Sequence, residues 1–103
     1  MGTFGNPAIQ ETGRVPFLVG GEWRHSATDR WAPVYNPATG ETIAQVPFAT
    51  PHEVAAAVEA AVKAYPAWRA TPPIERARLM FRYKELLERH FEELALLITR
   101  ENG

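Results

Sequence analysis

Residues that could support a metal site are few and widely separated in this chain of 103 residues. The three histidines are His25, His52 and His90, and none lies in an H-x-x-x-H pattern or forms a carboxylate-supported pair in the sequence. Isolated imidazoles of this kind are typical of a protein surface. We therefore predict that the chain has no metal-binding residue.

Nucleophilic catalysis also lacks its usual side chains. The chain contains no cysteine, which excludes a thiolate nucleophile, a thiolate metal site and a disulfide from these residues. Ser26 is the only serine, and it lies in a polar turn without a G-x-S-x-G context. The carboxylates of Glu92 and Glu93 begin a possible last helix, where negative charge complements the helix dipole. Residue chemistry alone predicts no catalytic site.

Binding of phosphate or nucleic acid is not indicated either. Gly20-Gly21 has no G-x-G-x-x-G pattern and no following helix, so a tight turn explains it better than a phosphate-binding loop. Arginines and glutamates are interleaved between positions 75 and 89, and the formal net charge of the chain is −1. Interleaved charges of this kind are typical of a solvent-exposed helix face. The aromatic residues are best explained as packing anchors. We expect no nucleic-acid partner.

No segment is typical of a membrane or exported protein. No apolar run approaches the ~20 residues that a membrane-spanning helix needs. The N-terminus lacks the basic and then apolar pattern of a signal peptide. We therefore expect a cytoplasmic protein without a membrane partner.

The elements that would position these residues begin with short strands. Residues 1–15 show no periodicity and are expected to form a flexible N-terminal arm. Gly20-Gly21 then connects the segments 17–19 and 22–24 as a β-hairpin, because two glycines accept the positive φ values of a tight turn.

Two further strands are predicted after a polar link. The segment 31–35 is expected at a sheet edge, because Pro33 cannot donate a ladder hydrogen bond. A turn at 36–41 contains Pro37 and Gly40, residue types that suit its bends. The alternating pattern of 42–46 predicts the next strand.

The hydrophobic period changes to that of a helix at Thr50. Thr50-Pro51-His52-Glu53 is a capping box, in which the Thr hydroxyl and the Glu carboxylate each accept a backbone N–H. An apolar stripe at helical spacing follows, made of Val54, Val58, Ala61, Val62 and Tyr65. Pro66 is predicted to end this helix at about Tyr65, because the residue before a proline is pushed out of the helical region.

Thr71-Pro72 repeats the cap and proline signature and predicts a second helix. Its buried face is expected to comprise Ile74, Ala77, Met80, Phe81, Leu87 and Phe91. An apolar face continues to Ile98, and the pattern leaves open whether the helix breaks near His90. The sequence thus predicts an α/β chain with N-terminal hairpin strands and two or three helices.

The last helix ends at Asn102-Gly103, residue types that commonly close a helix before the chain turns to its next element. No further element follows in this sequence. We therefore expect the chain to be the front piece of a longer protein.

Several segments share an order that points to one family. The first are Phe17-Leu18-Val19-Gly20-Gly21-Glu22-Trp23 and Tyr35-Asn36-Pro37-Ala38-Thr39-Gly40-Glu41. Tyr65-Pro66-Ala67-Trp68, Glu75-Arg76-Ala77-Arg78-Leu79 and the stretch 97–103 follow. Together they resemble the opening of the NAD(P)-dependent aldehyde dehydrogenase superfamily. The resemblance implies that residues 16–103 are the incomplete N-terminal part of such a domain, a partial piece of its NAD-binding domain.

The stretches 80–87 and 97–101 are similar to the methylmalonate-semialdehyde dehydrogenase branch. That branch is CoA-acylating: it oxidises methylmalonate or malonate semialdehyde with NAD and gives propionyl-CoA or acetyl-CoA. A generic aldehyde or succinate-semialdehyde dehydrogenase is the alternative within the family. A stand-alone structural or interaction module is the alternative outside it.

The family mechanism, as the resemblance implies it, uses groups that this chain does not contain. A Cys thiolate attacks the aldehyde, hydride passes to the nicotinamide, and CoA or water releases the thioester. In relatives these residues lie downstream, so no catalytic or cofactor-binding residue of the family maps onto this chain. NAD, the semialdehyde and CoA are expected to bind only in a full-length relative, which is expected to be a homo-oligomer. The piece alone is expected to be inactive.

Overall fold

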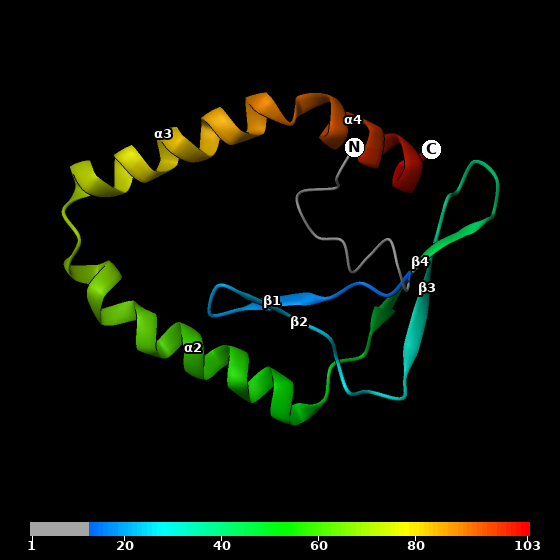
Figure 1. The fold of residues 1–103 in the computed structure, drawn as a ribbon, viewed down its shortest axis with the longest axis horizontal. Helices are drawn as coiled ribbons and strands as arrows, with labels where there is room; N and C mark the ends of the chain where they lie inside the picture. Colours follow the sequence, from blue (N-terminus) through cyan, green and yellow to red (C-terminus); the bar gives the residue numbers. More distant parts are fainter. Residues whose placement is uncertain (1–12) are drawn as a thin grey trace.

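The computed structural model describes residues 13–103 (Figure 1). The strands in chain order are β1 (Phe17–Val19), β2 (Glu22–Arg24), β3 (Trp31–Tyr35) and β4 (Thr42–Pro47). The helices that follow are α2 (Pro51–Ala70), α3 (Pro73–Arg89) and α4 (Phe91–Asn102). The predicted α/β class, with hairpin strands followed by helices, is confirmed.

The first hairpin forms as expected around its two glycines. Strands β1 and β2 pair antiparallel, with Leu18 opposite Trp23 and Val19 opposite Glu22. Gly20 and Gly21 have φ values of 61° and 82°, a conformation that residues with a side chain rarely adopt. The two glycines therefore allow the backbone conformation that the turn requires.

The second hairpin pairs β3 with β4, and its register places Pro33 opposite Gln45. Within the described residues β3 has β4 as its only neighbour, so Pro33 lies on an edge strand as predicted. The connecting turn is closed by the amide of Gly40, which donates to the Asn36 carbonyl at 2.7 Å. The strand predicted over 42–46 ends one residue later, at Pro47.

Only part of the expected N-terminal arm can be compared with the structure, because residues 1–12 lie outside the described residues. The end of the arm is held in place. The Val15 amide donates to the Gln45 carbonyl at 2.8 Å, and the Gln45 amide donates to the Gly13 carbonyl at 2.7 Å. The Arg14 guanidinium lies 4.5 Å from the centre of the Trp31 ring. Residues 13–15 are therefore fixed against the second hairpin.

Helix α2 begins with the predicted capping box but ends later than predicted. Thr50 Oγ1 accepts from the Glu53 amide at 3.3 Å, and Glu53 Oε2 accepts from the Thr50 amide at 2.8 Å. The predicted end at Tyr65 is wrong, because the helix continues through Pro66 to Ala70. Pro66 has no N–H and removes one backbone hydrogen bond, yet the turn that follows is still closed, since the Thr71 amide donates to the Trp68 carbonyl at 3.1 Å. The Thr71 hydroxyl donates to the Ala67 carbonyl at 2.8 Å.

The start of α3 also differs from the prediction. Thr71 closes α2, and Pro72 occupies the N-cap of α3 without a side-chain hydrogen bond. A proline fits both the extended residue before a helix and the first helical position. The pair Pro72-Pro73 therefore allows the helix to begin one residue later than predicted. The question left open at His90 is settled: the helix breaks there, at φ −104° and ψ 20°, and α4 begins at Phe91.

Helix α2 packs on the first hairpin through small side chains. Its alanine face, defined as Ala56, Ala57 and Ala60, is partly buried, and α2 contacts β1. Figure 1 shows α2 along one side of the hairpin, with α3 and α4 along the other side. Val19 on β1 is buried, at 5% exposed, and Pro16 just before the strand is buried as well.

The apolar stripe of α2 lies away from that contact. We call Val54, Val58, Val62 and Tyr65 the valine stripe; these side chains are 53% to 64% exposed. The buried face predicted for α3 is wrong, since Phe81 is 71% and Ile74 62% exposed. Helical spacing identifies an apolar face, but burial requires an opposing element, and the described residues place none there.

Candidate functional site

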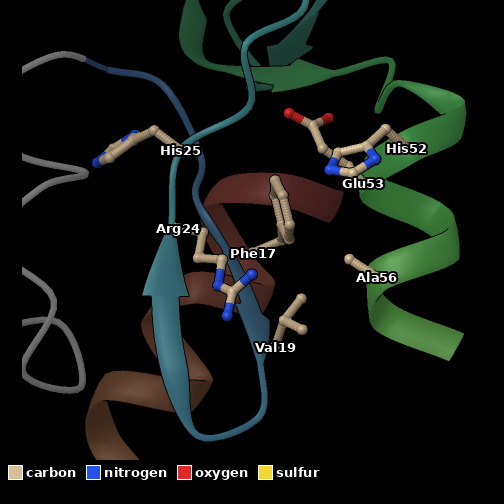
Figure 2. Close-up of a pocket in the computed structure, with 7 residues that line it drawn as sticks. All are labelled: Phe17, Val19, Arg24, His25, His52, Glu53 and Ala56. Carbon is tan, nitrogen blue, oxygen red and sulfur yellow. The ribbon is translucent and has the colours of Figure 1, made fainter. Parts of the chain in front are cut away.

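The strongest candidate site is a hollow of about 100 Å³ between the first hairpin and the start of α2 (Figure 2). Its lining residues are Phe17, Val19, Arg24, His25, His52, Glu53 and Ala56. The β1 side chains and Ala56 form its apolar wall. Ligand pockets usually measure about 300–1,000 Å³, so this hollow is too small for a dinucleotide.

Glu53 is the best-connected side chain at the hollow. Its Oε2 accepts from the Ser26 hydroxyl at 2.7 Å and from the Thr50 amide at 2.8 Å. Its Oε1 accepts from the Ala27 amide at 2.7 Å. These bonds join the link between β2 and β3 to the first turn of α2.

The same donors set the charge state of Glu53. The Ala27 amide, followed by the Ser26 hydroxyl and the Thr50 amide, lowers the pKa of Glu53 from 4.5 to about 2. The carboxylate is therefore ionised at neutral pH and has no proton to give to a substrate. A permanent acceptor of three hydrogen bonds suits a structural role better than acid–base catalysis.

The histidines give no metal site in the described residues. His25 and His52 both line the hollow, and Figure 2 shows them on its opposite sides. No group of three or more metal-ligating side chains occurs between residues 13 and 103. His90 lies elsewhere, and its Nδ1 is 3.2 Å from Glu93 Oε1.

The pairing of His90 with Glu93 was not among the sequence predictions, which considered the histidines only as metal ligands. The two residues are three positions apart across the start of α4, a spacing at which helical side chains meet. The sequence therefore contained the signal. Glu93 complements the helix start, as predicted, and also fixes the imidazole.

Ser26 is engaged in structure. Its hydroxyl donates to Glu53 and accepts from the Thr28 amide at 3.1 Å. The capping box identified Glu53 in the sequence, but the bond between Ser26 and Glu53 was not predicted, because the two residues are 27 positions apart.

The glycine pair and the arginines fit their non-catalytic interpretation. Gly20-Gly21 joins two strands, so the chain does not pass from it into a helix N-terminus, as it does in a glycine-rich phosphate-binding loop. On α3, Arg78 lies 2.7 Å from Glu75 and Arg89 lies 3.2 Å from Glu85. Gly20-Gly21 therefore provides no glycine turn leading into a helix for NAD, and the hollow beside Glu53 is too small for it.

Membrane insertion has no support from the helices. Within the described part of the chain, no helix is both long and apolar enough to span a bilayer.

Comparison with known proteins gives a consistent assignment. The model of the aldehyde dehydrogenase family matches residues 23–103. Malonate-semialdehyde dehydrogenase 2 of Oceanobacillus iheyensis is 52% identical over 89 residues, which are 86% of this chain and 18% of that protein. The enzyme of the same name from Geobacillus thermodenitrificans is 47% identical over 92% of this chain and 20% of its own length. The chain thus spans about a fifth of the curated relatives it matches.

Solved structures agree in fold. A methylmalonate-semialdehyde dehydrogenase from Oceanimonas doudoroffii superposes with a TM-score of 0.78 at 46% identity, over 84% of this chain and 17% of that one. An NAD-dependent benzaldehyde dehydrogenase from Corynebacterium glutamicum gives 0.79 at 40% identity, over 85% and 19%. The two similarities in fold are nearly equal, so the fold alone does not distinguish substrates.

Proposed function

This chain belongs to the aldehyde dehydrogenase family, and on that premise we propose that it is the N-terminal part of an NAD-dependent semialdehyde dehydrogenase. The identity of 52% with a malonate-semialdehyde dehydrogenase carries the proposal. In this assignment, residues 16–103 are scaffold within the NAD-binding domain. The complete protein would be a cytoplasmic homo-oligomer that acts on malonate or methylmalonate semialdehyde and is CoA-acylating, without a nucleic-acid or membrane partner.

The residues of this chain would contribute position rather than chemistry. The sequence has no cysteine to attack an aldehyde, and its most perturbed carboxylate, Glu53, accepts three structural hydrogen bonds. The hollow beside Glu53 is too small for NAD. We therefore propose that no catalytic, cofactor-binding or metal-binding residue lies in this segment and that the segment alone is inactive.

A broader aldehyde dehydrogenase is the second candidate. The benzaldehyde dehydrogenase supports it, because its TM-score equals that of the semialdehyde enzyme to within 0.01. Sequence identity favours the semialdehyde branch, at 46% against 40%. Succinate semialdehyde belongs to the same broader alternative, whereas a stand-alone module would need no further polypeptide.

The test combines the DNA that follows the Gly103 codon with two assays. We expect an open reading frame that continues and encodes a downstream cysteine. The product of the whole frame should form NADH with malonate semialdehyde and CoA faster than with benzaldehyde, and the purified 103-residue chain should form none. Turnover by the short chain, or a stop codon directly after Gly103, would refute the proposal. Faster oxidation of benzaldehyde would favour the second candidate.

A further inference from the structure

The three asparagines of the chain differ in the residue that follows each of them. Asn6 and Asn36 are each followed by a proline, whereas Asn102 is followed by Gly103. An asparagine deamidates when the backbone nitrogen of the next residue attacks its side-chain carbonyl carbon and closes a five-membered imide ring. Proline has no N–H to lose, so its nitrogen cannot attack, and glycine has no side chain to hinder the attack. Asn102 is thus the one asparagine of the sequence that is suited to this reaction.

The end of α4 holds both reacting groups in hydrogen bonds. The Gly103 amide donates to the Thr99 carbonyl at 3.0 Å, and Asn102 Nδ2 donates to the Ile98 carbonyl at 3.3 Å. Asn102 is the last residue of the helix, and closure of the ring requires its ψ angle to leave the helical range. The imide can therefore form only after the last turn of α4 opens.

A contact with the second hairpin keeps this last turn in place. Gly103 has a φ of 80°, and a Cβ built at that position would lie 3.5 Å from Pro37 Cγ and 3.9 Å from the Ala38 amide nitrogen. Figure 1 shows the end of α4 beside the turn that joins β3 to β4. Residues 101–103 are themselves exposed, so water and hydroxide reach the peptide group.

We propose that Asn102-Gly103 is a site of spontaneous deamidation whose rate is controlled by the contact between the end of α4 and Pro37. Hydroxide removes the Gly103 amide proton, and the nitrogen forms a bond to Asn102 Cγ. The bond from Cγ to Nδ2 then breaks, and ammonia leaves with a proton taken from water. A second water opens the imide and gives aspartate or isoaspartate. The reaction is independent of what the complete protein catalyses.

The product cannot restore the original end of the helix. Either form replaces the amide that donates to the Ile98 carbonyl with a carboxylate. The new negative charge lies at the C-terminal end of the helix dipole, where it is unfavourable. Isoaspartate also lengthens the backbone by a methylene before Gly103, which moves the glycine relative to Pro37. Deamidation is therefore a one-way change that weakens the contact between α4 and the hairpin turn.

The test compares the 103-residue chain folded in buffer and unfolded in guanidinium chloride at the same mildly alkaline pH. Mass spectrometry of the chymotryptic peptide that contains Asn102 follows the reaction. We expect aspartate and isoaspartate to form in guanidinium chloride, and to form at least about tenfold more slowly in the folded chain. Pro37→Ala should raise the rate in buffer at least about threefold and leave the rate in guanidinium chloride unchanged. Pro51→Ala, at the start of α2, is the matched control and should change neither rate.

Three results would overturn the proposal: no deamidation of Asn102 in guanidinium chloride, equal rates in the two solutions, or equal rates in buffer for Pro37→Ala and Pro51→Ala. Circular dichroism shows whether Pro37→Ala keeps the helix content of the unsubstituted chain. If it does not, nuclear Overhauser contacts between Gly103 and Pro37 in the unsubstituted chain decide. Contacts that are present before deamidation and lost after it support the proposal. Contacts that are absent before it, or that persist after it, overturn the proposal.

Discussion

The Ser26 hydroxyl donates to the Glu53 carboxylate at 2.7 Å, across 27 positions of sequence. This bond ties the polar link after the first hairpin to the first turn of α2. The same carboxylate completes the capping box with Thr50. One side chain thus closes a helix end and sets where the hairpin lies against that helix.

The stability that the Glu53 hydrogen bonds give to the fold should decrease in acid. The pKa of Glu53 is lowered to about 2 in the folded chain, so between its usual pKa and that value the unfolded chain binds more protons. The stability contributed by the carboxylate is therefore fully present above about pH 4.5 and is lost as the pH falls toward 2. Glu53→Gln should lower the unfolding temperature at neutral pH and flatten its decline in acid.

The matched control for Glu53 is Glu59→Gln on the same helix. Glu59 forms only an exposed pair with Lys63, at 2.9 Å. Pairs of that kind contribute about 0–1 kcal/mol, so this variant should follow the unsubstituted chain closely. Identical acid profiles for Glu53→Gln and the unsubstituted chain would show that the three hydrogen bonds do not stabilise the fold.

Val19 should be the most sensitive apolar position of the first hairpin. Its side chain is 5% exposed. Val19→Ala removes two buried carbons and should lower the free energy of unfolding, measured by urea titration, by about 2 kcal/mol. Leu18→Ala is the control, because Leu18 is on the same strand and is 56% exposed. Equal losses at the two positions would contradict the packing of β1 on α2.

The turn of the first hairpin should tolerate asparagine better than alanine. Gly20 has a φ of 61°, where a residue with an ordinary side chain costs about 1–2 kcal/mol. Gly20→Ala should therefore destabilise the hairpin, whereas Gly20→Asn should largely preserve it, because Asn-Gly suits this turn. Nuclear Overhauser contacts between Leu18 and Trp23, which pair across the strands, report the outcome. A hairpin equally intact with Ala and Asn would argue against the turn geometry.

Proline at position 66 should limit the stability of α2. Alanine is about 3 kcal/mol more favourable than proline inside a helix, so Pro66→Ala should raise the helix content and the free energy of unfolding. Pro51→Ala should bring no comparable gain, because Pro51 occupies the first turn, where no N–H partner is needed. Circular dichroism during urea titration measures both variants. Destabilisation by Pro66→Ala would mean that the ring makes a contact worth more than the missing hydrogen bond.

Local signals predicted most of the fold. Gly20-Gly21, the alternating pattern of β4 and the capping box at Thr50 each act within a few residues, and the structure confirms all three predictions. The errors concern competition between neighbours. Pro66 was expected to end α2, but the turn that follows it keeps the helix going. Thr71 was expected to start α3, but it closes α2 instead.

The features of the site that the sequence did not predict depend on contacts between residues far apart in the sequence. Ser26 and Glu53 meet only because the hairpin lies against α2, and no periodicity encodes that. The faces of α2 are a second case, because the larger apolar residues predict the buried face. In the structure, the face of α2 toward the hairpin instead carries the small residues Ala56 and Ala57, which let the hairpin approach closely.

Pro66 has a further consequence for the surface of α2. Proline has no N–H, so the carbonyl of Val62 loses the donor that a regular helix would supply four residues later. Water can serve this oxygen while the neighbouring side chains are exposed. Once a partner covers them, it must present an amide, a hydroxyl or a trapped water at that point, because an unsatisfied buried carbonyl is costly. A contact that looks purely aliphatic would thus contain one directional hydrogen bond, which could fix the register in which the two surfaces meet.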